Sequence, residues 1–248
     1  MRRLANKTLR YAGDNQCRNI DKTNNIKLNS FHFGQDNAPQ ISRRVEARKP
    51  SVLKRFVDVV GAGTGLILLA PLLAMIAVAV KFTSRGPIIF RQERYGLNGE
   101  RFTIFKFRTM HDHMCDGTGV SQTVSNDPRV TAVGNFLRRS NFDELPQLVN
   151  VLKGDMSLVG PRPHVPGMLA AGIAYEKFDS RYMDRHLARP GITGLAQVNG
   201  YRGETADALS ARMRLEHDLA YLEKQSLTLD LKILARTFIR EFFRGNGY

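Results

Sequence analysis

Residues 59–80 read VVGAGTGLILLAPLLAMIAVAV, a run of 22 residues without a charged side chain. A straight helix of this length would extend ~33 Å at about 1.5 Å per residue, which is enough to cross a hydrocarbon core of about 30 Å. The polar stretch of residues 1–50 comes before it, so the run is not a secretory signal peptide. This segment therefore predicts a membrane helix.

Basic residues flank this run at both ends, whereas a simple crossing has its excess of Lys and Arg on the cytoplasmic side. The flanking cations are Lys54, Arg55, Lys81 and Arg85. Inside the run, Pro71 follows Ala70, and a proline removes a backbone hydrogen bond and favours a break in a helix. We predict a re-entrant helix over residues 51–84 that breaks at Ala70-Pro71 and returns to the same face. A full span and a buried core helix are the alternatives. At its polar edge, we expect Asp58 to pair with Arg55, one turn earlier.

The chain of 248 residues is strongly basic, because 37 Lys and Arg outnumber 23 Asp and Glu and give a formal net charge of +14. Such a charge indicates an anionic partner, which is a nucleic acid, an anionic lipid or a phosphorylated substrate. The basic residues are not interleaved with a recognisable DNA- or RNA-binding module, so we expect no nucleic-acid partner. Residues 1–50 are polar, basic and without periodicity, and they predict a disordered tail.

Two adjacent carboxylates stand out in the stretch from Ser140 to Gln147, which reads SNFDELPQ. Proline is tolerated in the first turn of a helix, so Pro146 predicts a helix that begins near Asp143. Asp143 and Glu144 would then lie at the positive end of the helix dipole, where phosphates bind. An ionised carboxylate beside a phosphate site suits nucleophilic phosphoryl chemistry. A plain helix cap is the alternative.

Alternation of apolar and polar residues over 101–110 predicts a half-buried strand with Lys106 and Arg108 on one face. The Asn-Gly pair within residues 95–99 predicts the turn of a hairpin with the strand before it. Further along we expect a helix near 133–139, a short strand at 156–159, a strand through Val198 and a helix from a Thr205 cap to about Lys224.

One arginine lies between two prolines in Gly160-Pro161-Arg162-Pro163. Because the prolines restrict the backbone, less entropy is lost when the planar guanidinium binds a phosphate. Arg162 is therefore a predicted phosphate ligand.

The last segment predicts an amphipathic helix with a basic face. Its cations recur at four-residue spacing beside an apolar stripe: Lys232, Arg236, Arg240 and Arg244, and Leu231, Leu234, Phe238 and Phe242. Such a helix suits an anionic membrane surface. A helix packed on the core with a solvated basic face is the alternative.

Six motifs, taken in order, resemble the bacterial sugar transferase family, the monotopic polyprenyl-phosphate phosphoglycosyl transferases. They are KRFVD at 54–58, FKFRTM at 105–110, DPRVT at 127–131, DELPQ at 143–147, KGDMSLVGPRP at 153–163 and RPGITG at 189–194. The resemblance covers roughly residues 51–248, and six motifs in order are far more specific than any one of them.

The resemblance implies a helix-rich α/β (α+β) fold. After the basic tail over 1–50, it places a Pro-broken re-entrant membrane helix at 51–84 and a small cytosolic catalytic domain with interfacial amphipathic helices at 85–248. The family often has Ser before the helix-breaking Pro, where this chain has Ala70. The chain is similar to the short members, which lack an additional four-helix membrane region.

The resemblance also implies an activity. A sugar 1-phosphate would pass from a UDP-sugar to undecaprenyl phosphate, with release of UMP, at the cytosolic face of the bacterial inner membrane. This would be the first membrane step of exopolysaccharide, capsule or O-antigen synthesis, and inner-membrane phospholipid would be a further partner; a homo-oligomer is left open. Residues 201–205 resemble members that use UDP-glucose or UDP-galactose. An N-acetylated UDP-sugar and a non-catalytic membrane scaffold of polysaccharide assembly are the alternatives.

By the family pattern, Asp143 attacks the sugar-bearing phosphate and forms a phosphosugar-aspartyl intermediate, and Glu144 assists with protons or metal. A carboxylate ~4 Å from a phosphate anion is repelled by about 4 kcal/mol per charge pair at an effective dielectric constant of 20. A cation must offset this repulsion, so we expect Mg²⁺ on Asp143, with Glu144 as a further candidate ligand. The predicted phosphate-binding residues are Arg162, Arg108, Arg129 and Lys106.

Overall fold

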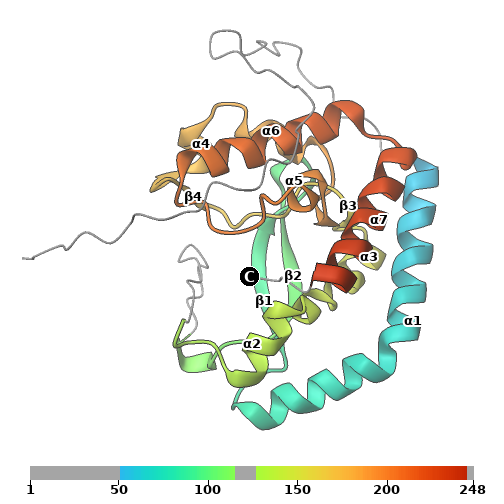
Figure 1. The fold of residues 1–248 in the computed structure, drawn as a ribbon, viewed down its shortest axis with the longest axis vertical. Helices are drawn as coiled ribbons and strands as arrows, with labels where there is room; N and C mark the ends of the chain where they lie inside the picture. The colour runs from blue at the N-terminus through green and yellow to red at the C-terminus, as the bar shows by residue number, and fades with distance from the viewer. Residues whose placement is uncertain (1–50, 115–126, 245–248) are drawn as a thin grey trace, which may run out of the picture. The chain divides into compact units, whose positions relative to one another are not determined.

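The computed structural model describes residues 51–114 and 127–244, and they begin with the long helix α1, Val52–Thr83 (Figure 1). Among these residues, α1 is the one helix that is long and apolar enough to cross a membrane, with a mean hydropathy of 2.4 over its most apolar window. Only 11% of that window is buried, so the alternative of a buried core helix is wrong. The predicted tail over 1–50 lies outside the described residues.

Figure 1 shows that α1 bends partway along its length, and Pro71 is the proline inside this helix. The pyrrolidine ring removes one backbone donor and clashes with the carbonyl of the preceding turn, which accounts for a bend. The helix nevertheless continues from Val52 to Thr83. The predicted break at Ala70-Pro71 is therefore a bend within one helix.

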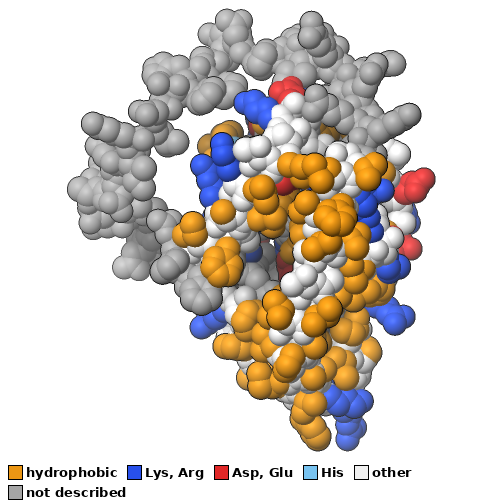
Figure 2. All heavy atoms as spheres, turned by 90° about the vertical axis from the view of Figure 1, so that its right-hand side faces the viewer, with side chains coloured by type: hydrophobic (Ala, Val, Ile, Leu, Met, Phe, Trp, Pro, Cys, Tyr) orange, Lys and Arg blue, Asp and Glu red, His pale blue; other side chains and the backbone are white. Residues whose placement is uncertain are grey.

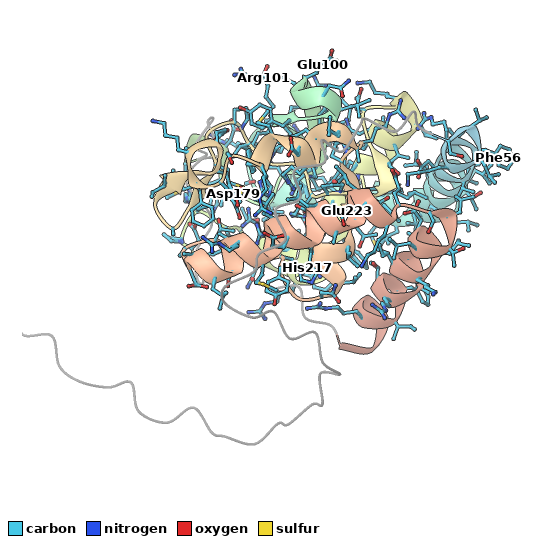
Figure 3. All side chains as sticks on the ribbon, turned by 90° about the horizontal axis from the view of Figure 1, so that it is seen from above. Phe56, Glu100, Arg101, Asp179, His217 and Glu223 are labelled. Carbon is cyan, nitrogen blue, oxygen red and sulfur yellow. The ribbon has the colours of Figure 1, made fainter. Side chains whose placement is uncertain are left out.

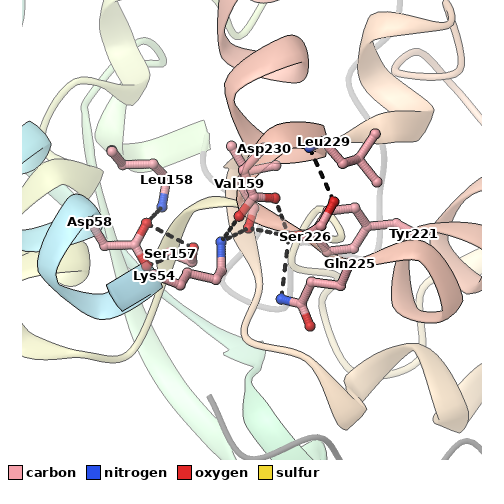
Figure 4. Close-up of polar contacts among 10 residues, drawn as sticks. All are labelled: Lys54, Asp58, Ser157, Leu158, Val159, Tyr221, Gln225, Ser226, Leu229 and Asp230. Atoms are coloured by element: carbon pink, nitrogen blue, oxygen red, sulfur yellow. Dashed lines mark hydrogen bonds and ion pairs between the residues drawn. The ribbon is translucent and has the colours of Figure 1, made fainter. Parts of the chain in front are cut away.

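Polar contacts hold the first turns of α1 against distant parts of the chain (Figure 4). Lys54 Nζ donates to the Asp230 carboxylate at 2.7 Å and to the Val159 carbonyl at 3.1 Å. Asp58 accepts hydrogen bonds from Ser157 Oγ and from the Leu158 backbone N–H, each at 2.9 Å. These contacts connect α1 with the strand at 157–159 and with the C-terminal helix.

The expected pairing of Asp58 with Arg55 is wrong. The Arg55 guanidinium instead donates to the carbonyls of Val151 at 2.6 Å and Leu152 at 2.8 Å. These carbonyls belong to the last turn of α3, Gln147–Lys153, where α-helical donors run out, although the Gly154 N–H also donates to the Val151 carbonyl at 3.1 Å. Spacing along one helix predicts only contacts within that helix, whereas Asp58 and Arg55 each bind groups from another element.

The predicted hairpin is confirmed. Strand β1, Ile89–Tyr95, pairs antiparallel with β2, Arg101–Phe107, and the register runs from Ile89↔Phe107 to Tyr95↔Arg101. The short 3₁₀ helix η1, Leu97–Gly99, forms the connection, and Asn98 has the positive φ of 56° that the turn requires.

The rest of the described chain is rich in helices and has only short strands, which confirms the coarse α/β prediction. Strand β3, Ser157–Val159, pairs in parallel with β6, Gly191–Thr193, and β4, Leu169–Ala170, pairs antiparallel with β5, Ile173–Ala174. The remaining α-helices are α2 (Ala132–Arg139), α4 (Tyr175–Phe178), α5 (Leu195–Val198), α6 (Ala208–Lys224) and α7 (Leu227–Arg244). The other 3₁₀ helices are η2 (Asp112–Met114), η3 (Phe142–Glu144) and η4 (Tyr182–Leu187).

Two expected elements have other boundaries. The strand expected to continue to Val198 ends at Thr193, and α5 follows it directly. The helix expected from a Thr205 cap begins at Ala208, where the Asp207 side chain accepts from the Ser210 N–H at 2.7 Å. Thr205 Oγ1 donates instead to the Leu169 carbonyl at 2.7 Å. Both Asp and Thr are good N-caps, so tertiary contacts decided between them.

Gly134 allows α2 to lie against the backbone that follows β2. A Cβ at this position would be 2.0 Å from the Thr109 carbonyl oxygen, which already accepts from the Thr131 N–H at 3.0 Å. We expect Gly134→Ala to lower the free energy of unfolding by about 1–3 kcal/mol, as overpacking does.

Thermal unfolding in detergent measures this effect. Gly63→Ala is the matched control, because Gly63 also lies inside a helix and its Cβ would meet nothing within 4 Å. Equal stability of the two variants would contradict the packing argument.

Candidate active site

A cavity of about 220 Å³ lies between the hairpin, η3 and the loops that follow β3 and α5. Its walls carry eight basic side chains and three carboxylates: Arg94, Lys106, Arg108, Arg129, Arg138, Arg162, Arg202 and Arg214, and Asp143, Glu144 and Glu204. All six residues predicted for catalysis or phosphate binding line this one cavity. An excess of one charge in a cleft attracts a ligand of opposite charge, here an anion such as a diphosphate.

Asp143 and Glu144 belong to η3 and not to the first turn of an α-helix, so the predicted helix start is wrong. The α-helix α3 begins only at Gln147, with Pro146 at its N-cap. Proline has no N–H, so it cannot donate to the Phe142 carbonyl as an α-helix would require. The Leu145 N–H makes the shorter 3₁₀ hydrogen bond to that carbonyl, at 3.3 Å.

Glu144 is held by two cations from different elements. Lys106 Nζ on β2 donates to its Oε1 at 2.7 Å, and Arg162 binds both of its oxygens, at 2.6 and 3.1 Å. Burial disfavours the ionised form of Glu144, but Arg162 and Lys106 outweigh burial and keep its pKa well below the usual range. Glu144 is thus an ionised, fully engaged carboxylate.

Asp143 is equally buried, with 8% of its surface exposed, but its surroundings differ. Within residues 51–114 and 127–244, no donor makes a hydrogen bond to its carboxylate. Burial raises its pKa to about 6; Lys106 opposes this shift and the negative charge of Glu144 adds to it. The surroundings of the two neighbouring carboxyl groups therefore shift their pKa values in opposite directions. Enzymes use this arrangement to give two carboxylates different chemical roles.

Arg108 and Arg129 line the same cavity, but both have partners inside the protein. Arg108 Nη2 donates to the Ser84 carbonyl at 2.6 Å and to the Val80 carbonyl at 3.3 Å, near the C-terminal end of α1. Arg129 Nη2 pairs with the Asp127 carboxylate at 2.6 Å. Arg108 thus attaches the end of α1 to the wall of the cavity, and phosphate binding by either residue stays a prediction.

Sequence reasoning did not single out four of the arginines in this cavity: Arg94, Arg138, Arg202 and Arg214. Arg138 Nε donates to Thr109 Oγ1 at 2.8 Å, and Arg202 Nη2 donates to Asn141 Oδ1 at 2.9 Å. Arg214 Nε donates to the Tyr201 carbonyl at 3.1 Å and so holds the loop that carries Arg202.

The sequence did contain a signal for Arg94, which is the alternation of residues along the hairpin strands. The hairpin register puts alternate residues of β1 and β2 on one face, and this face includes Arg94 and Lys106. Burial, followed by the nearby charge of Arg162, lowers the pKa of Arg94 to about 10. Arg202 lies in the stretch of residues 201–205 that resembles family members using UDP-glucose or UDP-galactose. For Arg138 and Arg214, tertiary packing alone brings their elements to the cavity.

Comparisons with known proteins show the family to which this chain is similar. The family model described as bacterial sugar transferase matches residues 49–244. The exopolysaccharide production protein PSS of Rhizobium leguminosarum bv. phaseoli is 47% identical over 197 residues, which are 79% of this chain and 98% of that protein.

Two similar proteins are named UDP-glucose:undecaprenyl-phosphate glucose-1-phosphate transferase. The one from Xanthomonas campestris pv. campestris is 47% identical over 79% of this chain and 40% of its own length. The one from Escherichia coli (strain K12) is 48% identical over 79% of this chain and 42% of its own length. The chain therefore spans nearly all of the Rhizobium protein and about two fifths of these two transferases.

Proposed function

The chain belongs to the bacterial sugar transferase family, and from this premise we propose that it transfers glucose 1-phosphate from UDP-glucose to undecaprenyl phosphate and releases UMP. The names of the Xanthomonas and Escherichia coli relatives support these substrates. The observation that carries the proposal is the Asp143 carboxylate, which accepts no hydrogen bond from the described residues and lies in a cavity with eight basic side chains.

In the proposed mechanism, an Asp143 carboxylate oxygen attacks the phosphorus that bears the sugar. The bond from this phosphorus to the bridging oxygen breaks, UMP leaves, and the sugar phosphate stays on Asp143. A phosphate oxygen of undecaprenyl phosphate then attacks the same phosphorus and displaces Asp143, which regenerates the carboxylate. Two successive displacements of this kind give ping-pong kinetics.

Glu144 takes a positioning role in this mechanism. A carboxylate whose pKa lies well below its usual range is a weak base at neutral pH, so proton transfer by Glu144 is unsupported. Its two oxygens instead keep Lys106 and Arg162 beside Asp143. These two cations are suited to stabilise the negative charge of the donor diphosphate.

Mg²⁺ fits this cavity through a single carboxylate. The described residues contain no group of three or more His, Cys, Asp and Glu that could enclose a metal ion. Mg²⁺ sites, however, commonly combine one or two carboxylates with substrate phosphates. Asp143 offers an unengaged carboxylate for this purpose, whereas Glu144 already accepts from Lys106 and Arg162. When bound, Mg²⁺ would neutralise charge on the diphosphate.

We also propose that α1 enters the cytoplasmic leaflet of the inner membrane, bends at Pro71 and returns, with residues 85–248 as the cytosolic catalytic domain. The apolar face seen in Figure 2 supports this topology. On α1, Ile67 is 76% exposed and Phe82 is 87% exposed, and Phe56 points away from the protein in Figure 3. Lys81 and Arg85, just beyond the apolar run, are exposed and suit anionic headgroups.

Part of the predicted amphipathic pattern of α7 supports a role of this helix at the membrane surface. Leu231 and Phe238 are exposed, whereas Leu234 packs on the core. Lys232 and Arg236 are exposed, but Arg240 donates to the Gln197 carbonyl at 3.1 Å. The side chains of Phe242 and Arg244 lie outside the described residues.

Nucleotide release tests the proposed activity. The purified chain is incubated with undecaprenyl phosphate, Mg²⁺ and one of several UDP-sugars, and UMP is measured with and without a chelator. We expect Mg²⁺-dependent UMP release from UDP-glucose. Release only from UDP-galactose or from an N-acetylated UDP-sugar would assign that sugar as the donor in place of UDP-glucose. No release from any donor would favour the scaffold alternative.

Replacing Arg162 should weaken use of the donor. We expect Arg162→Ala to lower kcat/KM for UDP-glucose about 10- to 150-fold, which is about 1.5–3 kcal/mol, because a charge-assisted contact is lost and Glu144 loses its bidentate partner. Arg162→Lys should retain only part of the wild-type kcat/KM, since an ammonium cannot form the bidentate pair. Steady-state kinetics measure both, with the exposed Arg139→Ala as control. Unchanged donor kinetics in Arg162→Ala would remove this residue from the site.

Activity should fall at a higher pH than it would if Asp143 had an ordinary aspartate pKa. Because the attacking group is the ionised form of Asp143, with a pKa of about 6, kcat/KM for the donor should fall about tenfold per pH unit below pH 6. An unperturbed Asp, with a pKa of about 3.9, would keep full activity through pH 5. A flat profile between pH 7 and 5 would contradict the raised pKa.

A further inference from the structure

A second cavity, of about 260 Å³, lies on the other side of Glu144. It is formed by η3, α3, β6, α5 and α7, and its lining is mainly apolar. Side chains from these elements include Phe142, Leu145, Leu148, Ile192, Val198 and Thr237. The donor chemistry proposed above does not use this cavity, because a nucleotide sugar needs many hydrogen-bonding partners.

The two cavities share part of their walls. Asn141, Glu144 and Arg202 line both of them. Arg202 Nη2 reaches Asn141 Oδ1 at 2.9 Å, so the loop after α5 and the residues before Asp143 meet at this boundary. A molecule that occupies the second cavity can therefore extend one end to the nucleophile.

The second cavity also adjoins the apolar surface of the protein. It is lined by Thr237 of α7, and the next residue, Phe238, is 66% exposed. Val149, which follows the lining residue Leu148 on α3, is exposed as well. Figure 2 shows a hollow within this hydrophobic face, with charged side chains visible inside it. An apolar chain could thus pass from the membrane side towards the basic cavity.

We propose that the second cavity binds the isoprene units next to the phosphate of the lipid acceptor, with that phosphate at the shared boundary near Arg202. This inference rests on the proposed function, because it takes a polyprenyl phosphate as the acceptor. The two cavities differ in polarity: the basic cavity suits the nucleotide diphosphate, and the apolar one suits the hydrocarbon. The acceptor phosphate would then enter the position that UMP vacates, because in-line attack on the phosphosugar-aspartyl phosphorus comes from the face opposite Asp143.

Thr237 allows a volume test away from the catalytic residues. Its Oγ1 lies 2.7 Å from Thr193 Oγ1 and also donates to the Ile233 carbonyl. Thr237→Phe adds bulk to the cavity, Thr237→Val removes only the hydroxyl, and Thr228→Phe makes the same change at an exposed position of α7. We expect Thr237→Phe to raise KM for undecaprenyl phosphate at least tenfold, Thr237→Val to raise it far less, and Thr228→Phe to change it less than twofold.

A donor-only measurement separates this proposal from the proposed function. UMP released in the first turnover without acceptor should have the same amplitude in all three variants and in the wild-type chain. Absence of this burst in the wild type would defeat the proposed two-step chemistry itself. A normal burst with an unchanged acceptor KM in Thr237→Phe would overturn the cavity proposal alone.

Photolabelling decides the question even if Thr237→Phe does not fold. The wild-type chain is irradiated with a polyprenyl phosphate that carries a diazirine on the isoprene unit next to the phosphate, and the labelled peptides are identified. We expect adducts on β6, α5 or the face of α7 around Thr237, and their loss when unlabelled undecaprenyl phosphate competes. Adducts confined to α1 would overturn the proposal.

Discussion

Asp143→Asn should reduce turnover at least about a thousandfold, because an amide cannot attack the donor phosphorus and loss of a covalent nucleophile removes a whole reaction path. The fold should persist, since the Asp143 carboxylate accepts no hydrogen bond from the described residues and the amide has nearly the same shape. A neutral side chain is also less costly to bury than a carboxylate, so the melting temperature should stay equal or rise.

Two measurements check this result. With labelled UDP-glucose and no acceptor, the wild-type chain should retain label at Asp143, and Asp143→Asn should retain none. Asp184→Asn is the matched control, because Asp184 is exposed and lines neither cavity. Near-normal activity of Asp143→Asn, or kinetics that need both substrates bound together, would refute the nucleophile assignment.

Asp218→Asn should cause a large loss of stability. Arg185 and Asp218 are 1% and 2% exposed, and Arg185 Nε and Nη2 donate to Asp218 Oδ2 at 3.0 and 2.7 Å. Removing one partner leaves a buried guanidinium without its counter-ion, which costs about 3–5 kcal/mol. For a domain of this size, the melting temperature should fall by roughly 6–20 °C.

This ion pair also bears on the active site. Arg185 Nη2 donates to the backbone carbonyl of Arg162 at 2.7 Å, so the pair supports the segment that binds Glu144. We expect the double variant Arg185→Met/Asp218→Leu to recover most of the lost stability, because no buried charge is left unpaired.

The more exposed pair of Arg181 and Asp179 provides the comparison. Asp179→Asn should cost at most about 1 kcal/mol, since solvent screens such pairs. Thermal unfolding in detergent measures all three variants. Equal losses for Asp218→Asn and Asp179→Asn would contradict the argument from burial.

Local patterns in the sequence were sufficient for several elements. The uncharged run at 59–80 predicted α1, since helix length and apolarity are properties of consecutive residues. Alternation and an Asn-Gly turn predicted the β1–β2 hairpin and its position. The six ordered motifs indicated the family that the comparisons then showed. In each case the signal lies within a short segment or in the order of segments.

Other features needed the folded chain. Pro71 indicated an interruption of α1, but the protein contains a bend within a continuous helix. Asp58 accepts hydrogen bonds from β3, and Asp207 caps α6 in place of the predicted Thr205. These outcomes depend on groups that are distant along the chain, which spacing rules within one element do not include.

Asp143 and Glu144 illustrate this division best. Sequence by itself determined that two carboxylates stand next to each other before a proline, within a family motif. Tertiary structure alone decided which of them is neutralised by Lys106 and Arg162 and which is left without a donor among the described residues. The physical reason is that a carboxyl pKa follows from burial and from nearby charges, and the cations in this cavity come from elements that only folding brings together.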